Sequence, residues 1–150
     1  MSRQVVVDAS AAAAWVLEDE WTPESARLLA WIASRTLTLI IPAIWSYEVL
    51  NLLRTAVLRG RLEEADAKAA LNALAAIPRD IVSAESQGEA AVLDTAVRLQ
   101  LSAYDAAYMN LAQSRGMDLI SGDTGILRLR PRYPWIWAVE DFVKSFQPPS

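Results

Sequence analysis

Short apolar runs alternate along the chain with longer segments whose apolar residues recur at helical spacing. The clearest run is 5–7, three valines in a row, and Asp8 ends it just before the helix-forming alanines 11–14. β-Branched residues without polar alternation are typical of a strand buried on both faces, as in a parallel sheet. We therefore expect a strand that passes directly into a helix. This places Asp8 at the carboxyl end of the sheet, the edge where open α/β sheets bind ligands.

The rest of the pattern predicts further strands and helices in alternation. Thr22 and Pro23 mark one helix start, as a cap and a first helical residue, and Ser102 is expected to cap another helix. The predicted strands are 5–7, 37–41, 81–82, 119–120 and 135–139, and the predicted helices are 9–18, 23–34, 44–58, 62–76, 85–101, 103–114 and one that begins at 140. We expect one α/β domain over residues 1–150, with a central, mostly parallel β-sheet of about five strands flanked by helices, and a frayed tail at 147–150.

Composition narrows the chemistry that this fold could carry. The chain has 150 residues, of which 53% are hydrophobic, and a formal net charge of −4. This is enough apolar material for a folded core, and no apolar run is long enough to cross a bilayer, so we expect a cytoplasmic protein. Cysteine and histidine are both absent, which excludes thiolate and histidine metal sites, histidine general bases and Ser-His-Asp triads. Catalysis would depend on carboxylates, hydroxyls, Lys or Arg, with a hard metal that binds oxygen.

Four acidic residues stand in apolar surroundings, whereas the other acids lie in polar clusters. They are Asp8, Glu48, Asp105 and Asp123. Asp8 and Asp123 each follow a predicted parallel strand, so both should reach the same edge of the sheet. Asp105 lies in the first turn of the helix that leads into the Asp123 strand, and Glu48 lies within about two helical turns of a strand end.

Each of the three aspartates also has a purely structural interpretation. Asp8 could cap the helix that follows it, Asp105 lies three residues after Ser102 as in a capping box, and Asp123 could be a turn or cap residue. Glu48 has no such local role, because a glutamate on the inward side of a helix finds no free backbone donor. An unpaired buried carboxylate costs several kcal/mol, so some other group must compensate it.

Carboxylates gathered at one edge repel one another. At a separation of about 4 Å a pair costs about 4 kcal/mol at the dielectric near a protein surface, and no lysine lies near any of the four acids in sequence. A divalent cation would neutralise the cluster, and an all-oxygen set of ligands suits Mg²⁺ or Mn²⁺. Such a site can activate water and stabilise in-line displacement at a phosphodiester.

Four motifs resemble those of the PIN-domain ribonucleases and, more narrowly, those of the VapC toxins of bacterial type II toxin–antitoxin systems. They are Val-Val-Asp-Ala-Ser, Trp-Ser-Tyr-Glu-Val-Leu-Asn-Leu-Leu-Arg, Leu-Ser-Ala-Tyr-Asp-Ala-Ala-Tyr and Leu-Ile-Ser-Gly-Asp. Each motif is weak alone, but four in this order over nearly the whole chain are specific. The resemblance implies that the metal-binding catalytic acids are Asp8, Glu48, Asp105 and Asp123, with hydroxyl or amide neighbours of the metal at Ser10, Asn51 and Ser121.

The resemblance further implies a Mg²⁺- or Mn²⁺-dependent endoribonuclease that acts as the toxin of a toxin–antitoxin pair. Its implied partners are an RNA substrate and a cognate VapB-like antitoxin, and the Ala- and Leu-rich stretch 62–77 leads us to expect a homodimer. Two positions depart from the family pattern. Ser121 stands where threonine is more frequent, and Thr124 and Gly125 stand where some relatives have a further acid. The number of metal ions is therefore left open.

Other phosphoryl-transfer and nucleotide-binding families fit less well. A haloacid-dehalogenase-like phosphatase needs a second aspartate two residues after the first, where this chain has Ser10, and the glycines form neither a Walker A loop nor a dinucleotide fingerprint. The alternative that remains is a non-catalytic PIN-like module that binds nucleic acid or protein, with its acids acting as caps and solvated charges. The six tryptophans are expected mainly in the core.

Overall fold

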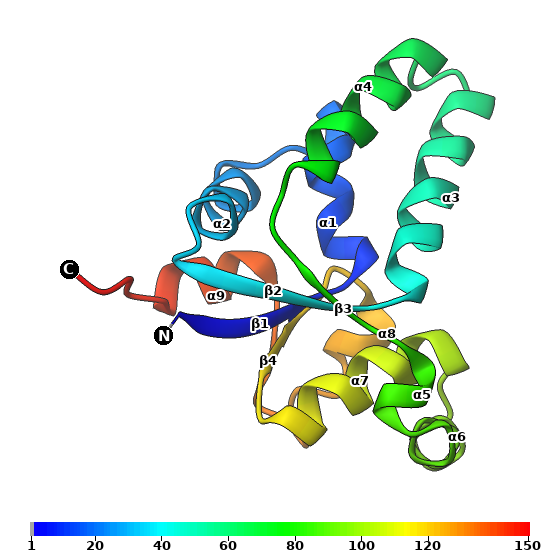
Figure 1. The fold of residues 1–150 in the computed structure, drawn as a ribbon, viewed down its shortest axis with the longest axis vertical. Coiled ribbons are helices and arrows are strands. Elements are labelled where there is room, and N and C mark those ends of the chain that lie inside the picture. Colours follow the sequence, from blue (N-terminus) through cyan, green and yellow to red (C-terminus); the bar gives the residue numbers. More distant parts are fainter. Residues whose placement is uncertain (1) are drawn as a thin grey trace.

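A sheet of five parallel strands lies at the centre of the computed structural model, which describes residues 2–150 (Figure 1). The strands are β1 (Arg3–Val7), β2 (Leu37–Pro42), β3 (Asp80–Val82), β4 (Asp118–Ile120) and β5 (Ile136–Trp137), in the spatial order β3-β2-β1-β4-β5. The chain therefore builds the sheet outward from β1, first toward β3 and then toward β5. The predicted parallel α/β architecture is confirmed.

The apolar run at the start of the chain forms the middle of this sheet. Val5, Val6 and Val7 have no exposed surface, because β1 has a paired strand on each side and helices over both faces. In β4, Leu119 and Ile120 are also fully buried. Strands buried on both faces have no polar side to display, which is why their sequences do not alternate.

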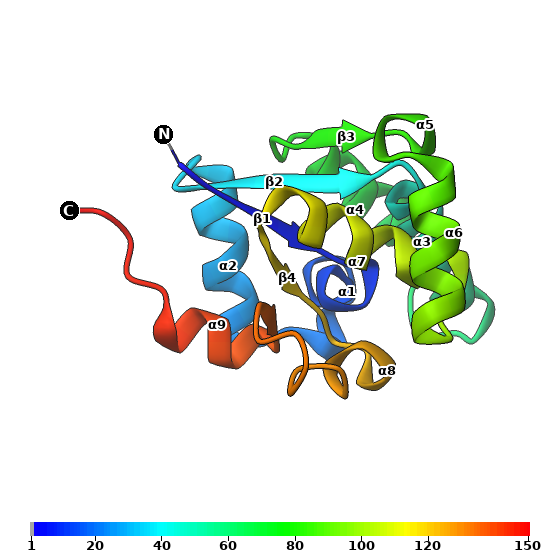
Figure 2. The same cartoon turned by 90° about the horizontal axis from the view of Figure 1, so that it is seen from below.

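Helices cover the two faces of the sheet (Figures 1 and 2). One layer contains α1 (Ala9–Val16), α2 (Pro23–Ala33), α3 (Ile44–Leu58), α4 (Glu64–Ala75) and α9 (Val139–Ser145), and the other contains α5 (Ala84–Gln87), α6 (Glu89–Leu99) and α7 (Ala103–Arg115). The 3-10 helix η1 (Glu18–Glu20) and α8 (Thr124–Leu127) are single turns in connections. Nowhere in the described chain does a helix combine the length and the apolarity of a membrane span.

The strands share one direction, which determines where a site can form. Figure 2 shows β1, β2 and β3 running away from the end of the molecule that carries both termini and toward the end where α3 and α6 lie. The carboxyl ends of the strands therefore open between α3 in one layer and α7 in the other.

Two helix starts follow the capping chemistry that the sequence predicts. The Thr22 hydroxyl accepts a hydrogen bond from the Ser25 N–H (3.0 Å), and the Ser25 hydroxyl accepts one from the Thr22 N–H (3.1 Å), which completes a capping box. At α7 the Ser102 hydroxyl accepts from the Asp105 N–H (3.1 Å). These bonds satisfy backbone donors that a helix end leaves free.

Four elements differ from the sequence prediction, among them the unpredicted 3-10 turn η1, and the other bounds differ by at most two residues. The predicted helix 85–101 is two helices, α5 and α6, because Gly88 between them has φ +89° and ψ 103°, far from helical values. The predicted strand 135–139 is only the two-residue β5, an edge strand that pairs with β4 alone, and α9 already begins at Val139. The turn α8 was not predicted, since four residues are too few to show helical periodicity.

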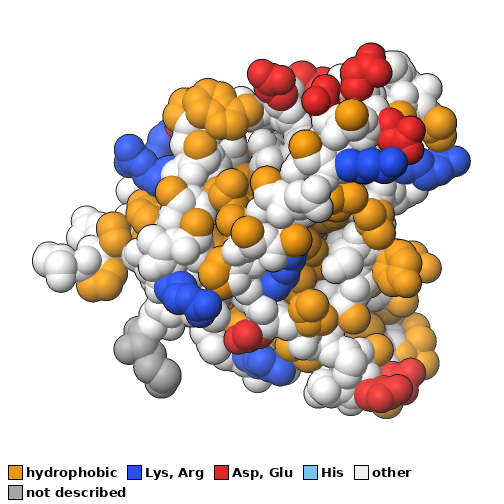
Figure 3. Space-filling model, turned by 45° about the horizontal axis from the view of Figure 1, so that its top comes forward, with side chains coloured by type: hydrophobic (Ala, Val, Ile, Leu, Met, Phe, Trp, Pro, Cys, Tyr) orange, Lys and Arg blue, Asp and Glu red, His pale blue; other side chains and the backbone are white. Residues whose placement is uncertain are grey.

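Apolar side chains remain exposed mainly on α3, α6 and α7. Figure 3 shows hydrophobic side chains along the side where α3 and α6 lie and acidic ones at the end that α4 forms. On α6, Leu93 and Val97 are exposed, whereas the exposed apolar residues of α4 are alanines. Five of the six tryptophans pack in or against the core as expected, and Trp21 is exposed.

The break at Gly88 leads to a test of backbone conformation. We expect Gly88→Asn to lower the free energy of unfolding by about 1–2 kcal/mol, because its φ and ψ lie outside the left-handed helical region that asparagine tolerates. Gly116→Asn is the matched control, since Gly116 has φ 63° and ψ 38°, within that region. Urea unfolding of both variants measures the difference, and equal losses would contradict this account of the break.

Candidate functional site

The strand order reverses at β1, which creates a crevice at the carboxyl ends of β1 and β4. The register pairs Val7 with Ile120, and the Asp8 N–H donates to the Ile120 carbonyl at 3.0 Å. Crossover connections leave β1 and β4 in opposite directions across the sheet. Such a switch point is the usual ligand site of open parallel sheets, and here Asp8 and Asp123 both lie beside it.

The Asp8 carboxylate is buried and held by three donors. Asp8 Oδ1 accepts from the Ser10 hydroxyl (2.6 Å) and from the Ala11 N–H (3.0 Å), and Asp8 Oδ2 accepts from the Ser121 hydroxyl. The Ser10 hydroxyl also accepts from the Gly122 N–H at 2.9 Å. Ser10 and Ser121 therefore lie where the sequence predicts them, beside the acids, and they tie the end of β1 to the end of β4.

Asp8 and Asp123 both cap a helix, as the structural interpretation of these residues predicts. Asp8 caps α1 through the Ala11 N–H, and Asp123 caps α8 by accepting from the Gly125 N–H at 2.9 Å. The Asp123 N–H in turn donates to the Ser121 hydroxyl at 3.0 Å. Capping uses one oxygen of each carboxylate, so it leaves acceptor capacity on the other.

Glu48 has the compensating donor that its position in α3 requires. The hydroxyl of Tyr108, from α7, donates to Glu48 Oε1, and Tyr108 is itself 2% exposed. Tyr108 was not among the site residues predicted from the sequence. The spacing in the sequence could have identified it, because Tyr108 lies three residues after Asp105 and therefore on the same face of α7.

All four predicted acids line one open cavity of about 530 Å³. They reach it from four separate elements: the ends of β1 and β4, α3 and α7. Ser10, Asn51 and Tyr108 also line the cavity, whereas Ser121 lies behind Asp8 and acts through its hydrogen bond. The structure thus brings the whole predicted set to one place, with no hydrogen bond to the Asn51 side chain among the described residues.

Burial and repulsion disfavour the charged forms of Asp8, Glu48 and Asp105. Burial raises the pKa of Asp8, although the hydrogen bonds from Ser10 and Ser121 lower it in part. Burial also raises the pKa of Glu48, with the Tyr108 bond opposing this shift and repulsion from Asp105 adding to it. The pKa of Asp105 is raised by burial and then by repulsion from Asp123. Ion pairs within the described residues involve none of the four acids.

This donor set suits a hard divalent cation in its chemistry. It offers carboxylate, hydroxyl and amide oxygens, and burial, with repulsion between the acids added to it, raises the pKa values of Asp8 and Glu48. Within residues 2–150, however, no three acidic side chains are gathered closely enough to form a ready-made metal site. Mg²⁺ is usually held by one or two carboxylates with waters as its other ligands, so a site of three gathered acids is not required.

Comparison with protein-family models matches residues 5–130 to the PIN domain. The chain belongs to the PIN domain family. PIN domains are typically metal-dependent nucleases, and the parallel sheet flanked by helices is consistent with the PIN fold. The resemblance read from the four sequence motifs is confirmed at this level.

Two solved structures show a similar fold. PAE2754 from Pyrobaculum aerophilum has a TM-score of 0.70 and 28% sequence identity, over 95% of this chain and 88% of that chain. A toxin–antitoxin complex from Klebsiella pneumoniae has a TM-score of 0.57 and 13% identity, over 90% of this chain and 97% of that chain. At 13% identity the likeness concerns the PIN fold alone. No curated protein matches the chain.

The hydrogen bond between Tyr108 and Glu48 predicts a specific pH dependence of stability. Because the pKa of Glu48 is raised above its ordinary value of 4.5, this group favours the folded state at low pH, and that contribution is lost as the pH rises through the folded-state pKa. Tyr108→Phe removes the donor that lowers this pKa. We expect the free energy of unfolding of Tyr108→Phe to be about 1–3 kcal/mol below that of the wild type at neutral pH. At pH 4 this difference should be smaller.

Urea unfolding of the metal-free protein between pH 4 and pH 8 measures this difference. Tyr133→Phe is the matched control, since the hydroxyl of this buried tyrosine pairs with Arg98 (3.2 Å) and with none of the four acids. Its effect should not change over this range. A Tyr108→Phe loss that is the same at every pH would show that the bond does not act on the charge of Glu48.

Proposed function

We propose that this PIN domain is a Mg²⁺- or Mn²⁺-dependent endoribonuclease that hydrolyses RNA phosphodiester bonds. The observation that carries the proposal is the convergence of four carboxylates from four separate elements on one open cavity, where none of them pairs with a cation from residues 2–150. Membership of a family of typical metal-dependent nucleases supports the reaction class. RNA as the substrate rests on the VapC-like motifs.

In this proposal Asp8, Glu48, Asp105 and Asp123 hold the divalent ion. When bound, the ion would neutralise the carboxylates and supply positive charge and an activated water at the scissile phosphate. The chain's own hydrogen bonds keep the acids in place. Ser10 and Ser121 orient Asp8, and Tyr108 orients Glu48. Asn51 lines the same cavity and is proposed to contact the ion's water or the substrate.

We further propose that the nuclease is the toxin of a toxin–antitoxin pair in the cytoplasm. The VapC-like motifs support this role, and the structural neighbour from Klebsiella pneumoniae is itself a toxin–antitoxin complex. A VapB-like antitoxin would cover the acidic cavity, place an Arg or Lys against the carboxylates and dock apolar residues on the exposed aromatics beside it. A homodimer through the exposed alanines of α4 is part of the same proposal.

Metal dependence and the four acids are tested together. We expect RNA cleavage with Mg²⁺ or Mn²⁺, none in excess EDTA, and a loss of at least about 100-fold in each of Asp8→Asn and Asp105→Asn. Asparagine caps helices about as well as aspartate, so the cap interpretation predicts nearly unchanged activity in both. Gel analysis of a labelled RNA over time provides the measurement.

The stability of the same variants separates the two interpretations in a second way. Without metal, Asp105→Asn should be as stable as the wild type at pH 7 or more stable, because it removes a half-buried charge that Asp123 repels. Asp66→Asn, an exposed acid in the first turn of α4 and remote in sequence from the four, controls for the substitution. Full cleavage by both acid variants would leave a non-catalytic binding module as the better account.

The proposed inhibition is tested with the product of the adjacent small gene. We expect it to co-purify with this chain and, at saturation, to abolish cleavage, because it covers the acidic cavity. Titration of the partner into the cleavage assay measures this effect. Binding that leaves cleavage unchanged at saturation would place the partner away from the acids and end this account of regulation.

A further inference from the structure

Two tyrosines stand at the rim of the acidic cavity with their rings in solvent. Tyr47 on α3 is 72% exposed and Tyr104 on α7 is 57% exposed, and both line the cavity that holds the four acids. Neither ring packs against another aromatic ring, and neither hydroxyl forms a hydrogen bond to a described residue. Core packing therefore does not explain these two aromatic side chains.

The same local pattern produces both positions. Tyr47 immediately precedes Glu48, and Tyr104 immediately precedes Asp105. Neighbouring residues of a helix point about 100° apart, so each acid faces the floor of the cavity while its tyrosine stands at the rim. The helices α3 and α7 belong to opposite layers of the sheet (Figure 1). The two tyrosines thus approach the cavity from opposite walls.

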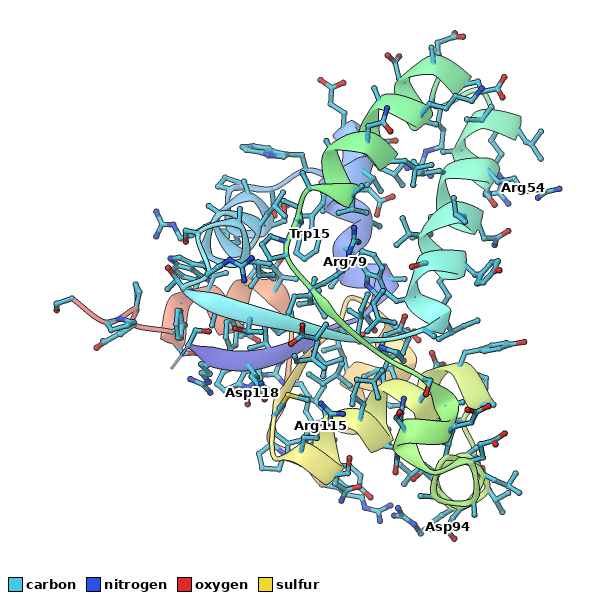
Figure 4. All side chains as sticks on the ribbon, viewed as in Figure 1. Trp15, Arg54, Arg79, Asp94, Arg115 and Asp118 are labelled. Atoms are coloured by element: carbon cyan, nitrogen blue, oxygen red, sulfur yellow. The ribbon has the colours of Figure 1, made fainter. Side chains whose placement is uncertain are left out.

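The side chains that line this cavity provide no positive charge to bind the phosphates of a nucleic acid. No Arg or Lys is among the residues that line it, and Arg54 on α3 projects away from the molecule (Figure 4). Phosphate contacts normally supply most of the affinity of a nucleic-acid-binding protein. A substrate with a polyanionic backbone must therefore gain affinity here from another source besides the ion, and stacking of bases on aromatic rings is the main sequence-tolerant alternative.

We propose that Tyr47 and Tyr104 form a clamp that stacks on the bases of unpaired nucleotides on either side of the scissile phosphate. This inference rests on the proposed nuclease function and assigns two residues that position its substrate. Bases inside a duplex are already stacked and present no free face, whereas nucleotides in loops and single strands can be splayed onto aromatic side chains. The clamp makes single-stranded segments of RNA the substrate and excludes uninterrupted duplex.

The clamp is tested by binding in a background that cannot cleave. The probes are a fluorescently labelled ten-nucleotide RNA and the same strand annealed to its complement, and the background is Asp123→Asn, which keeps a capping residue for α8. Fluorescence anisotropy measures the dissociation constants. We expect Tyr47→Ala and Tyr104→Ala each to weaken single-strand binding about 5- to 100-fold, and the corresponding tryptophan variants to retain it. The duplex should bind weakly and respond to neither substitution.

Leu58→Ala is the matched control, because Leu58 is a large apolar residue on the same helix, is 68% exposed and does not line the cavity. It should bind the single strand as the background protein does. Alanine variants that bind the single strand with unchanged affinity would overturn the clamp. So would a loss of binding that accompanies conversion of a dimer to a monomer in sedimentation, since the tyrosines would then belong to an interface between copies.

Cleavage by the otherwise wild-type protein separates failure of the clamp from failure of the proposed function. If the chain cleaves RNA and the two alanine variants show an unchanged KM, the clamp is wrong while the nuclease stands. If the chain cleaves no RNA with any divalent ion but still loses single-strand binding in the alanine variants, the clamp stands on a non-catalytic module.

Discussion

A buried carboxylate at the end of the central strand is the constraint around which this molecule is organised. Asp8 is 4% exposed, and a carboxylate at that depth requires donors from the protein itself. The Ala11 N–H comes from the helix that follows, the Ser10 hydroxyl from its first turn, and the Ser121 hydroxyl from the neighbouring strand end. Because these donors come from both sides of the switch point, satisfying Asp8 also fixes the ends of β1 and β4 against each other.

The other acids of the cavity are restrained less completely, and this difference has an energetic meaning. Glu48 has one donor, from Tyr108, while burial and repulsion raise the pKa values of Glu48 and Asp105. The apolar core supplies the stability of the fold, and the cavity opposes it. Charge repulsion of this kind is relieved by a cation, so under the proposed function the region that destabilises the metal-free protein is also the region where the ion binds.

The cavity combines two kinds of surface that are both costly for a protein without a partner. Its floor carries carboxylates without cations, and its rim carries two exposed tyrosines. Each feature alone has an ordinary explanation as a cap or as a scattered surface aromatic. Their placement together on α3 and α7 suits a ligand that has both a phosphodiester and apolar rings, as the proposed nucleic-acid substrate has.

The sequence by itself determined where most strands and helices form and that the candidate site is made of acids. Tertiary structure determined which groups form hydrogen bonds with these acids. The valines of β1, the caps at Thr22 and Ser102 and the isolated acids are local signals, because strand burial, capping and polarity act over a few residues. Local signals of this kind did not reveal three features: the break at Gly88, the length of β5 and the donor to Glu48. Tyr108 and Glu48 are sixty residues apart in the chain, and Ser121 meets Asp8 only because the register places β4 beside β1. Hydrogen bonds between distant residues depend on how strands pair and helices pack, and a linear pattern of polar and apolar positions carries no record of that pairing.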